Sequence, residues 1–598
     1  MRYLDALTSV PSVLGYGLRQ KLKEGYHGAD LRADLMAALV VGVVALPLSM
    51  ALAVASGVAP QHGLYTAIIA GIVCSLLGGT RAQVTGPTAA FVVILVPIVQ
   101  RFGLGGLLLA GQLAGFILLA MGVLKLGRLI SYIPHPVTTG FTAGIAVVIG
   151  TIQLKDFLGL QFATAPDHYA DRWRAMWLAR GTISPWELGV GALTLALLVL
   201  LPRVIKKVPA PLLALALAAA AAALAHELIP GFHVATIGTR FHSMVDGVEV
   251  AGIPPLPPLP LLPWNLPGPG ADGSPLGINF HIIRELLPSA FAIAMLGAIE
   301  SLLSAVVSDG MTGTRHDPNA ELLALGIGNV LCPIFGGIAA TGAIARTATN
   351  IRAGARSPIA AALHGVFILA CTVVLAPLVA WLPMAALAAL LLMVARNMAE
   401  ARHFVHILRV APRSDVTVLV TCFLLTVLFD MVQAVAVGVV LASLLFMRRM
   451  AEISEVKTSA EGVLGQMELP EGVQVYEIAG PLFFGAAQKA MSAFDDIHDR
   501  TRVLILYLEG VPVIDATGLV ALETLIDRSR RSGVKLILAA LKKQPAEALE
   551  RAQIRRDPGK LALAPDLESA LSMAILHTAR VKPAGPPSTS SPSVPAAA

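Results

Sequence analysis

Charged side chains are scarce in this sequence. Asp, Glu, Lys and Arg make up 14% of the 598 residues and hydrophobic types make up 56%, whereas a soluble domain usually carries about a quarter charged residues. The deficit is uneven, because long apolar runs fill residues 33–447 while residues 449–580 have the composition of a soluble domain. This pattern excludes a wholly soluble chain and indicates a membrane part followed by a soluble part.

Cysteine is also rare, and its spacing excludes a disulfide framework or a metal cluster. The four cysteines, Cys74, Cys332, Cys371 and Cys422, stand alone in separate apolar stretches, without the close pairing that ligand sets need. We interpret them as small buried hydrophobic residues. The sequence shows no nucleophile–base pair and no phosphate-binding loop either. Neither an enzyme nor a bound cofactor or metal is therefore expected.

Basic residues are arranged as in a multi-pass membrane protein. Apart from the segment 155–185, a partial exception that carries Lys155, Arg172, Arg174 and Arg180, they gather in alternate short loops. Those loops contain Arg81; Lys125 and Arg128; Arg203, Lys206 and Lys207; Arg315; Arg352 and Arg356; Arg402, Arg409 and Arg413; and Arg448 and Arg449. Loops of this kind face the cytoplasm. Because this pattern explains the net charge of +6, no nucleic-acid partner is expected.

The apolar runs predict about fourteen membrane-spanning segments. Runs such as Ala37–Ala55 and Val416–Phe429 are near or below the roughly 20 residues that cross a bilayer. Residues 1–32 lack an apolar core with a cleavage site, so we expect the N-terminus to stay in the cytoplasm. With both termini in the cytoplasm of a bacterium, the proline-rich segment 231–285 faces the periplasm as an irregular cover. It divides the inner-membrane part into two halves.

Each half contains a short apolar helix that starts after a glycine-containing break. The first follows Thr85-Gly86-Pro87-Thr88 and ends near Gln100, and the second follows Thr341-Gly342 and ends near Asn350. Paired interruptions of this kind indicate discontinuous helices around a binding site near the middle of the membrane. With an odd number of spans in each half, the two halves have inverted topology.

Beyond Met450, strands and helices alternate. The predicted strands are Val473–Ala479, Arg502–Leu508 and Val534–Ala540, with helices near Ala486–Asp496 and over Gly518–Ser532. This alternation indicates one compact α/β domain. The predicted organisation is a cytosolic N-terminal segment (1–32), a transmembrane transport domain (33–448), a linker (449–468), the α/β domain (469–578) and a disordered tail (579–598) rich in Pro, Ser and Ala.

Two charged residues in the apolar part are the leading site candidates. Glu300 interrupts an otherwise apolar helix, where a carboxylate costs several kcal/mol unless it is paired, protonated or hydrated. Arg346 stands at the start of the second broken helix, where a guanidinium adds to the positive end of the helix dipole and forms an anion pocket. The alternatives are a structural hydrogen bond for Glu300 and a snorkelling side chain for Arg346.

This pair of charges suggests a coupling mechanism. If an ionised Glu300 lies near Arg346, the empty site is close to neutral, and the carboxylate repels an incoming dianion. Protonation of Glu300 leaves a positive site, so proton and anion bind with positive linkage. This is the logic of proton–anion symport.

Neutral groups are expected to complete the site. The predicted substrate-binding residues are Ser49, Thr85, Gly86, Thr88, Ser301, Thr341, Gly342, Ala345 and Arg346, with Glu300 for proton coupling. Each hydroxyl, taken alone, is more often a packing or backbone-bonding group. In the α/β domain, Asp515 and Thr517 are regulatory candidates, although an Asp before a helix is commonly its cap.

Several motifs together resemble the SulP family of anion transporters over nearly the whole chain. They are Gly57-Val-Ala-Pro60-Gln-His-Gly63-Leu-Tyr65, the turn Thr85–Pro87, Gly297-Ala-Ile-Glu300-Ser301 and the loop Asp515-x-x-Gly518 of the α/β domain, which resembles a STAS domain. The resemblance implies an all-α membrane domain of 14 helices in a 7+7 inverted repeat, with a core domain (helices 1–4 and 8–11) and a gate domain. It also implies a substrate between the N-termini of half-helices 3 and 10, an elevator-like movement of the core, and a homodimer.

Within the family, further motifs look most like the bacterial aerobic C4-dicarboxylate branch, which is associated with uptake of succinate, fumarate and aspartate with protons. These motifs are Ala294–Leu303, Asp309–Thr314, Ala343–Ala355 and Leu428–Val432. Two departures matter. Leu48 stands where many members carry Gln, which weakens an assumption of sulfate- or chloride-type coordination. Ala516 replaces the serine that anti-sigma antagonists phosphorylate, and Thr517 is a poor substitute by position.

Three functions follow from these observations. The leading hypothesis is proton-coupled uptake of a C4-dicarboxylate. The second is sodium-coupled uptake of bicarbonate or sulfate with Glu300 as a sodium ligand, against which a nearby Arg346 argues. The third is a membrane anion sensor that signals through its STAS domain. The expected partners are a small anion, the lipid membrane, a second copy of the chain and an unidentified cytosolic protein at the STAS domain.

Overall fold

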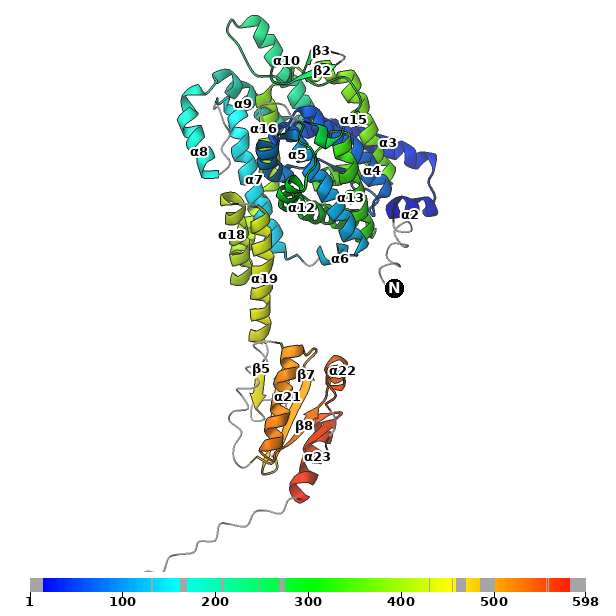
Figure 1. The fold of residues 1–598 in the computed structure, drawn as a ribbon, viewed down its shortest axis with the longest axis vertical. Coiled ribbons are helices and arrows are strands. Elements are labelled where there is room, and N and C mark those ends of the chain that lie inside the picture. Colours follow the sequence, from blue (N-terminus) through cyan, green and yellow to red (C-terminus); the bar gives the residue numbers. More distant parts are fainter. Residues whose placement is uncertain are drawn as a thin grey trace, which may run out of the picture. The chain divides into compact units, whose positions relative to one another are not determined.

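The structure is a computed structural model that consists of two compact units, Met1–Val440 and Leu441–Ala598. It describes residues 14–130, 133–161, 169–205, 209–245, 247–266, 268, 275–429, 431–453, 455–458, 469–483, 501–554, 557 and 559–580. The first unit is mainly helical, and the second is built around one sheet (Figure 1). The helix predicted near Ala486–Asp496 lies outside the described residues, as does the tail beyond Arg580.

Long apolar segments form the helices of the first unit. Among the described residues, ten are long and apolar enough to cross a membrane. They lie in α3 (Gly28–Ala55), α4 (Pro60–Leu77), α5 (Ala89–Val123), α7 (His135–Leu158), α9 (Pro185–Val204), α10 (Ala210–Leu228), α12 (Phe280–Thr312), α15 (Pro358–Val379), α16 (Met384–Met398) with α17 (Ala401–Val410), and α19 (Met431–Ile453).

Four further spans are shorter or hidden inside a longer helix. Gly103 in α5 has φ 67° and ψ −169°, which breaks this helix into two spans. The remaining three are α13 (Pro318–Ile334), α14 (Ile344–Arg352) and α18 (Arg413–Leu428). Together they give the fourteen segments predicted from the sequence, and the predicted fold class is confirmed.

Short elements connect the spans. They are α2 (Tyr16–Glu24), α6 (Gly127–Ile130), α8 (Tyr169–Leu178), η1 (Ala179–Thr182), α11 (Ile237–Arg240), β2 (His242–Val245), β3 (Val248–Ala251) and η2 (Pro263–Asn265). The segment 231–285, predicted to be irregular, therefore contains a short helix and an antiparallel hairpin of β2 and β3. The prediction holds for the run between β3 and η2, where successive prolines remove backbone donors.

Helix packing divides the first unit into a core and a gate. In the core, α15 packs on α3 and α4, while α5 packs on α12 and α13; in the gate, α7 packs on α16 and α18, and α9 packs on α10 and α16 (Figure 1). These contacts come in matched pairs. The contact of α3 with α15 corresponds to that of α12 with the second half of α5, and the contact of α7 with α18 corresponds to that of α16 with α9, as an inverted repeat requires.

A buried carboxylate ties the start of α3 to the chain between α14 and α15. Asp34 is fully buried. Its carboxylate accepts hydrogen bonds from the backbone N–H groups of Arg356 (2.6 Å) and Ser357 (3.1 Å), from the Ser357 hydroxyl (2.5 Å) and from the Tyr26 phenol (3.0 Å). Burial and the bond to Asp34 raise the pKa of Tyr26 to about 12. The phenol therefore remains a donor throughout the physiological pH range.

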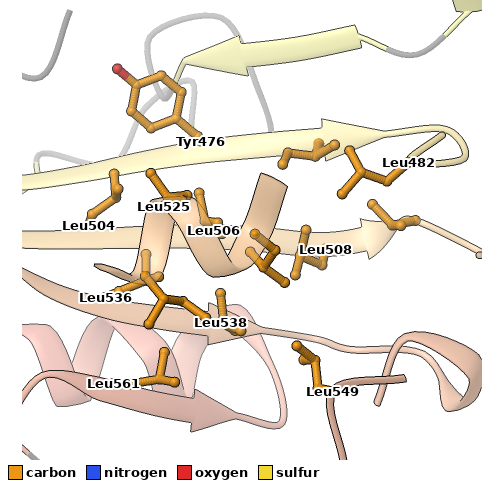
Figure 2. Packing of buried hydrophobic residues seen from close by; sticks show 14 of the residues in the cluster. Tyr476, Leu482, Leu504, Leu506, Leu508, Leu525, Leu536, Leu538, Leu549 and Leu561 are labelled. Atoms are coloured by element: carbon orange, nitrogen blue, oxygen red, sulfur yellow. The ribbon is translucent and has the colours of Figure 1, made fainter. Parts of the chain in front are cut away.

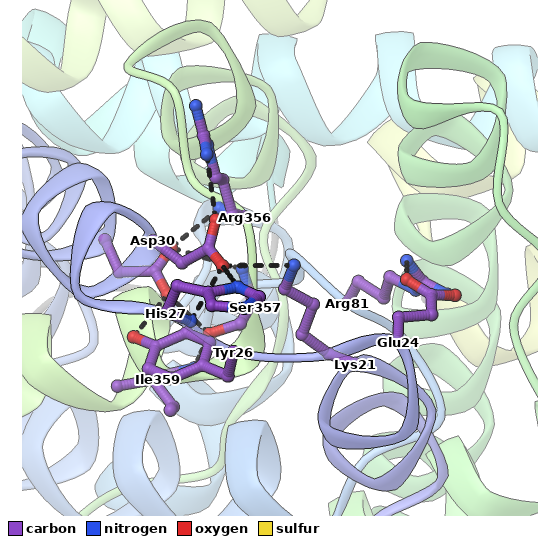
Figure 3. A network of polar contacts seen from close by, with 10 residues as sticks. Lys21, Glu24, Tyr26, His27, Asp30, Arg81, Arg356, Ser357 and Ile359 are labelled. Carbon is purple, nitrogen blue, oxygen red and sulfur yellow. Dashed lines mark hydrogen bonds and ion pairs between the residues drawn. The ribbon is translucent and has the colours of Figure 1, made fainter.

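Ion pairs of nearby residues add to this network of polar contacts (Figure 3). Asp30 contacts Arg356 at 2.8 Å and Lys21 at 3.4 Å, and Arg81 pairs with Glu24. Two loops that the charge pattern assigned to the same face of the membrane, those carrying Arg81 and Arg356, thus both contact the N-terminal segment.

The second unit contains a five-stranded sheet in the order β5-β6-β7-β8-β9. Its elements are β5 (Glu455–Thr458), β6 (Val473–Ala479), β7 (Val503–Gly510), α21 (Ala516–Arg531), β8 (Lys535–Ala539), α22 (Lys543–Arg551), β9 (Leu561–Ala564) and α23 (Leu567–Arg580). Strands β6 to β9 are parallel, and β5 is antiparallel to β6. The segment 449–468, predicted as a linker, contains the end of α19 and the edge strand β5 among its described residues.

The sheet is covered on both faces because its central strand β7 is apolar at every position from Val503 to Leu508. In β7, Leu504, Leu506 and Leu508 pack into the cluster that contains residues of α21 and α22, as Figure 2 shows for the labelled leucines. Val503 and Ile505 point to the opposite face and pack with residues of α23. Side chains alternate along a strand, and a parallel sheet buried on both sides needs such a continuous apolar run.

Replacement of Asp34 by Ala is expected to destabilise the membrane unit strongly. The change leaves four donors around a buried position without an acceptor, and each such buried donor costs about 1–3 kcal/mol. Thermal unfolding of the purified protein in detergent measures this loss. The control is Arg356→Gln, which keeps the backbone donors and removes an ion pair whose arginine side chain is 56% exposed. Asp30 keeps Lys21 as a partner in this control, so we expect a smaller loss of stability than for Asp34→Ala. Equal melting temperatures for the two variants would contradict the role given to Asp34.

Candidate functional site

Two short strands cross where the broken helices begin. β1 (Thr85–Gly86) pairs antiparallel with β4 (Thr341–Gly342), with Thr85 opposite Gly342 and Gly86 opposite Thr341. All four residues are buried. α5 starts two residues after β1 at Ala89, and α14 starts at Ile344. The paired strands therefore place the N-termini of the two half-helices on either side of one short ladder.

Neither half-helix has a side-chain cap at its N-terminus. The N-cap positions are Thr88 for α5 and Ala343 for α14, and neither makes a capping hydrogen bond. The first N–H groups of a helix have no partner within the helix. They carry the positive end of the helix dipole, so two uncapped ends inside the membrane favour an anion between them.

Arg346 adds a full positive charge at this position. Its side chain is 2% exposed, and its Nη2 donates to the carbonyl of Pro87, which follows β1 directly. Its Nε and Nη1 are buried without a hydrogen-bond partner among the described residues. One hydrogen bond therefore holds Arg346 to the chain that follows β1, and two of its donor groups are left for an anion.

Glu300 lies at the same site. Its Oε2 accepts a hydrogen bond of 2.8 Å from the hydroxyl of Thr88. The charges of Glu300 and Arg346 also attract each other. Thr88 at one helix N-terminus, Arg346 at the other and Glu300 on α12 thus form one group of side chains, which we call the central cluster.

The remaining sequence candidates have more varied positions. The Thr341 hydroxyl donates to the carbonyl of Gly297 at 2.8 Å and holds β4 on α12. Ala345 is exposed at the first turn of α14, next to the cluster. Thr85 is 1% exposed, and Ser49 on α3 is fully buried with a hydroxyl that has no partner among the described residues. The Ser301 hydroxyl accepts a hydrogen bond from Gln83 and donates one to Glu321, which are both outside the cluster.

Sequence reasoning missed a second buried carboxylate, Glu321, in the first turn of α13. It is 2% exposed. Its oxygens accept hydrogen bonds from Gly79 N–H (2.9 Å), the Thr80 hydroxyl (3.1 Å) and Gln83 Nε2 (2.7 Å), and Gln83 also donates to Ser301 at 2.7 Å. An acid in the first turn of a helix is typical of exposed helix ends, so no signal in the sequence distinguished it. Glu321 fixes the chain that leads into β1.

Other polar side chains brace the crossing. Asn329 binds the N–H and the carbonyl of Ala340 just before β4, and the Asn350 amide donates to Ala82 just before β1. The Thr347 hydroxyl accepts from the N–H of Val84. These bonds satisfy backbone groups that no helix serves.

The regulatory candidates of the α/β domain occupy a helix start. Asp515 is the N-cap of α21 and accepts from the N–H of Gly518 at 2.7 Å, while Thr517 is exposed in the first turn. Asp515 thus performs the capping role that its position indicated. Among the described residues, no group of three His, Cys, Asp or Glu side chains could hold a metal ion.

Comparisons with known proteins identify the family. Residues 31–422 match the family described as the sulfate permease family, and residues 466–570 match the STAS domain. A putative sulfate transporter of Bacillus subtilis (strain 168), YvdB, is 39% identical over 539 residues, which cover 90% of this chain and 96% of that protein. The chain belongs to the sulfate permease family. The resemblance to SulP transporters with a STAS domain is confirmed, and the protein is a multi-pass membrane transporter of anions, not an enzyme.

Further relatives and solved structures are also similar to this chain. The bicarbonate transporter BicA of Picosynechococcus sp. is 27% identical over 573 residues, covering 92% of this chain and 96% of that protein. The transmembrane domain of a cyanobacterial BicA matches 70% of this chain and 98% of its own, with a TM-score of 0.57 and 26% identity. Murine Slc26a9 matches 96% of this chain and 95% of its own, with a TM-score of 0.80 at 18% identity, and so shares the fold.

Gly86 is expected to be essential for the central cluster, because a Cβ there would lie 2.6 Å from Nη1 of Arg346. Gly86→Ala should displace the guanidinium without unfolding the protein. Loss of one charged hydrogen bond removes about 1.5–3 kcal/mol of binding, which is more than about tenfold in affinity. Anion uptake by proteoliposomes measures this effect. The control is Gly150→Ala in α7, where the added carbon meets no atom within 4 Å. Normal uptake by the Gly86 variant would exclude this cluster as the anion site.

Proposed function

We propose that this protein is a secondary active transporter that carries a small dianion into a bacterial cell together with a proton. The observation that supports it most directly is the central cluster, in which Thr88, Glu300 and Arg346 come together at two uncapped helix N-termini. The helices of the core that holds the cluster pack mainly on one another. An elevator-like movement of the core against the gate would carry the cluster from one face of the membrane to the other.

The charges of the cluster explain coupling to a proton. With Glu300 ionised, its charge offsets that of Arg346, and the site repels a dianion. With Glu300 protonated, Arg346 and the two helix N-termini leave a positive site, and the carboxyl group becomes a donor. Proton and anion then favour each other's binding. A sodium ion at Glu300 is the alternative, and the attraction between Glu300 and Arg346 argues against it.

For the substrate we propose a C4-dicarboxylate such as succinate. Its two carboxylates match two facing helix N-termini, and the motifs around Glu300 and Arg346 resemble the dicarboxylate branch. Sulfate and bicarbonate are the second candidates, and they are supported by the names of the relatives YvdB and BicA. A C4-dicarboxylate is longer than sulfate or bicarbonate. One uptake assay with all three anions therefore separates the two classes of substrate.

We further propose that both termini face the cytoplasm of the inner membrane, that the protein is a homodimer, and that its STAS domain binds a cytosolic protein. The orientation is supported by the basic loops, two of which contact the N-terminal segment through Arg81 and Arg356. A sensor that signals through the STAS domain would keep the same fold, but it would not accumulate anions.

Labelled succinate is expected to accumulate in proteoliposomes when an inward proton gradient is imposed in sodium-free buffer. A protonophore should abolish the accumulation, because the gradient drives it. Sulfate and bicarbonate are tested in parallel, with and without sodium. Uptake of sulfate or bicarbonate only in the presence of sodium would overturn the proposed substrate and coupling ion. Absence of uptake of all three anions would favour the sensor.

Glu300→Gln is expected to uncouple uptake from the proton gradient. Glutamine keeps a donor and the shape of a protonated carboxyl, so anion exchange should continue while accumulation against a gradient is lost. The measurement is the pH dependence of uptake and of exchange. Glu285→Gln is the control, because Glu285 lies on the same helix in an ion pair of 3.4 Å with the exposed Arg101. If uptake by the Glu300→Gln variant kept its full pH dependence, the proposed coupling mechanism would be contradicted.

A further inference from the structure

A cavity of about 210 Å³ lies between core and gate at some distance from the central cluster. The core contributes the end of α3, with Ser56 and Gly57, and the end of the first half of α5, with Val99 and Gln100. The gate side is formed by the end of α7, by α8 and by Arg240 of α11. We call this space the seam cavity.

The charge in the seam cavity is predominantly positive. Its charged lining residues are Lys155, Arg172 and Arg240 against a single carboxylate, Asp156, among the described residues. Asp156 accepts a hydrogen bond of 2.7 Å from Arg240. Three cations from three separate segments thus line one space, together with one carboxylate among the described residues.

A larger cavity of about 860 Å³ adjoins the seam cavity and shares Lys155, Asp156 and Arg240 with it. It also contains His233 and Glu187, whose Oε1 accepts from the N–H of Ala235. Among the described lining residues Lys and Arg balance Asp and Glu in the larger cavity, whereas Lys and Arg outnumber Asp and Glu in the smaller one.

The position of these cations explains an irregularity of the sequence. The segment 155–185 departs from the pattern that places basic residues in the cytoplasmic loops. α7 starts at His135, next to the basic loop with Arg128, and crosses the membrane once before Lys155. Lys155 and Arg172 therefore lie at the opposite end of the membrane unit from the basic loops. Basic residues at this end weaken the charge bias that orients the protein in the membrane, and their presence there indicates a function.

The first half of α5 connects the seam cavity with the central cluster. Thr88 lies at its N-terminus in the cluster, and Gln100 lies near its other end in the cavity. Twelve residues of helix span about 18 Å. An anion held in the cavity is thus one half-helix away from the site.

We propose that the seam cavity captures a small soluble anion, the transported substrate, before it reaches the central cluster. This inference rests on the proposed function only in taking a small anion as the substrate. A cleft lined by one sign of charge raises the local concentration of the opposite ion and its rate of association. The effect depends on the net field of Lys155, Arg172 and Arg240, not on one contact.

A lipid phosphate shares the anionic chemistry, and α8 has features of an interfacial helix. Trp173, Trp177 and Leu178 are exposed on it, as is Arg174. Arg172, by contrast, is half-buried and lines a cavity whose other walls are ends of core helices. The soluble anion is therefore the occupant proposed for the seam cavity, and lipid is left to the exposed side of α8.

The test measures the local potential without relying on transport. Gln100→Cys introduces a thiol into the seam cavity, while the four native cysteines are buried. In full-length protein in neutral lipid, we compare its reaction rates with the negatively charged sulfonatoethyl and the positively charged trimethylammonioethyl methanethiosulfonates. One unit charge changes the rate of each reagent by about two- to threefold in opposite directions. Arg172→Gln should therefore lower the ratio of the two rates by about fivefold.

The matched control is Arg174→Gln, which removes the same charge from the exposed side of the same helix. We expect it to leave the ratio unchanged, and Lys155→Gln to repeat the effect of Arg172→Gln. High salt should remove the difference between variants. Equal ratios for both arginine variants would overturn the proposal. So would loss of the ratio on addition of anionic lipid, since lipid would then be the occupant.

Measurement of anion uptake provides a second test of the proposal. At low ionic strength, Arg172→Gln should raise the KM for the transported anion by about two- to threefold with an unchanged maximal rate, and Arg174→Gln should not. A normal KM in a variant with an altered reagent ratio would overturn capture of the substrate. If the wild type transports none of succinate, sulfate and bicarbonate, the proposed function fails, and the reagent ratio still decides whether the cavity attracts anions.

Discussion

Hydrocarbon offers no hydrogen-bond partner to a backbone N–H or C=O group, so a helix that stops inside a membrane must have its end satisfied by the protein. In this transporter two helices start inside the membrane unit, and the chain before each of them runs as one strand of the β1–β4 ladder. The remaining backbone groups are bound by side chains of Asn329, Thr347 and Asn350. What is left unsatisfied is the pair of helix N-termini, and it is these that face the central cluster.

The polar residues of the core divide into two groups with different tasks. Glu321, Gln83 and Ser301 bind each other and the chain that enters β1, so they fix the crossing. Glu300 and Arg346 make few bonds: Glu300 is held by Thr88, and Arg346 by one carbonyl. Groups with unused hydrogen-bonding capacity beside a rigid frame are suited to bind and release a ligand. Adjacent residues Glu300 and Ser301 thus belong to different groups because successive side chains on a helix point about 100° apart.

The central cluster and the seam cavity contain different arrangements of charge. In the central cluster a single cation is opposed by a single acid, so protonation of Glu300 would turn a nearly neutral site into a positive one. In the seam cavity the described lining residues include three cations and one acid, Asp156, which accepts a hydrogen bond from Arg240. The first arrangement suits coupling, and the second suits attraction of an anion from solution. Both lie on the first half of α5, which belongs to the core.

The sequence by itself determined the membrane helices, three strands of the α/β domain and the class of the protein. Apolar runs gave the membrane helices, since length and hydropathy are local properties, and the period of Val473–Ala479 gave strand β6 with the bounds that the structure has. Glu300 was identifiable because a lone carboxylate in an apolar helix is costly wherever that helix lies. Only the tertiary structure decided which residues meet. Thr88, Glu300 and Arg346 come from three elements, and so do Lys155, Arg172 and Arg240. The residues of each group come together only because the two inverted halves pack against each other. Glu321, whose position in the sequence is typical of an exposed helix end, is buried for the same reason.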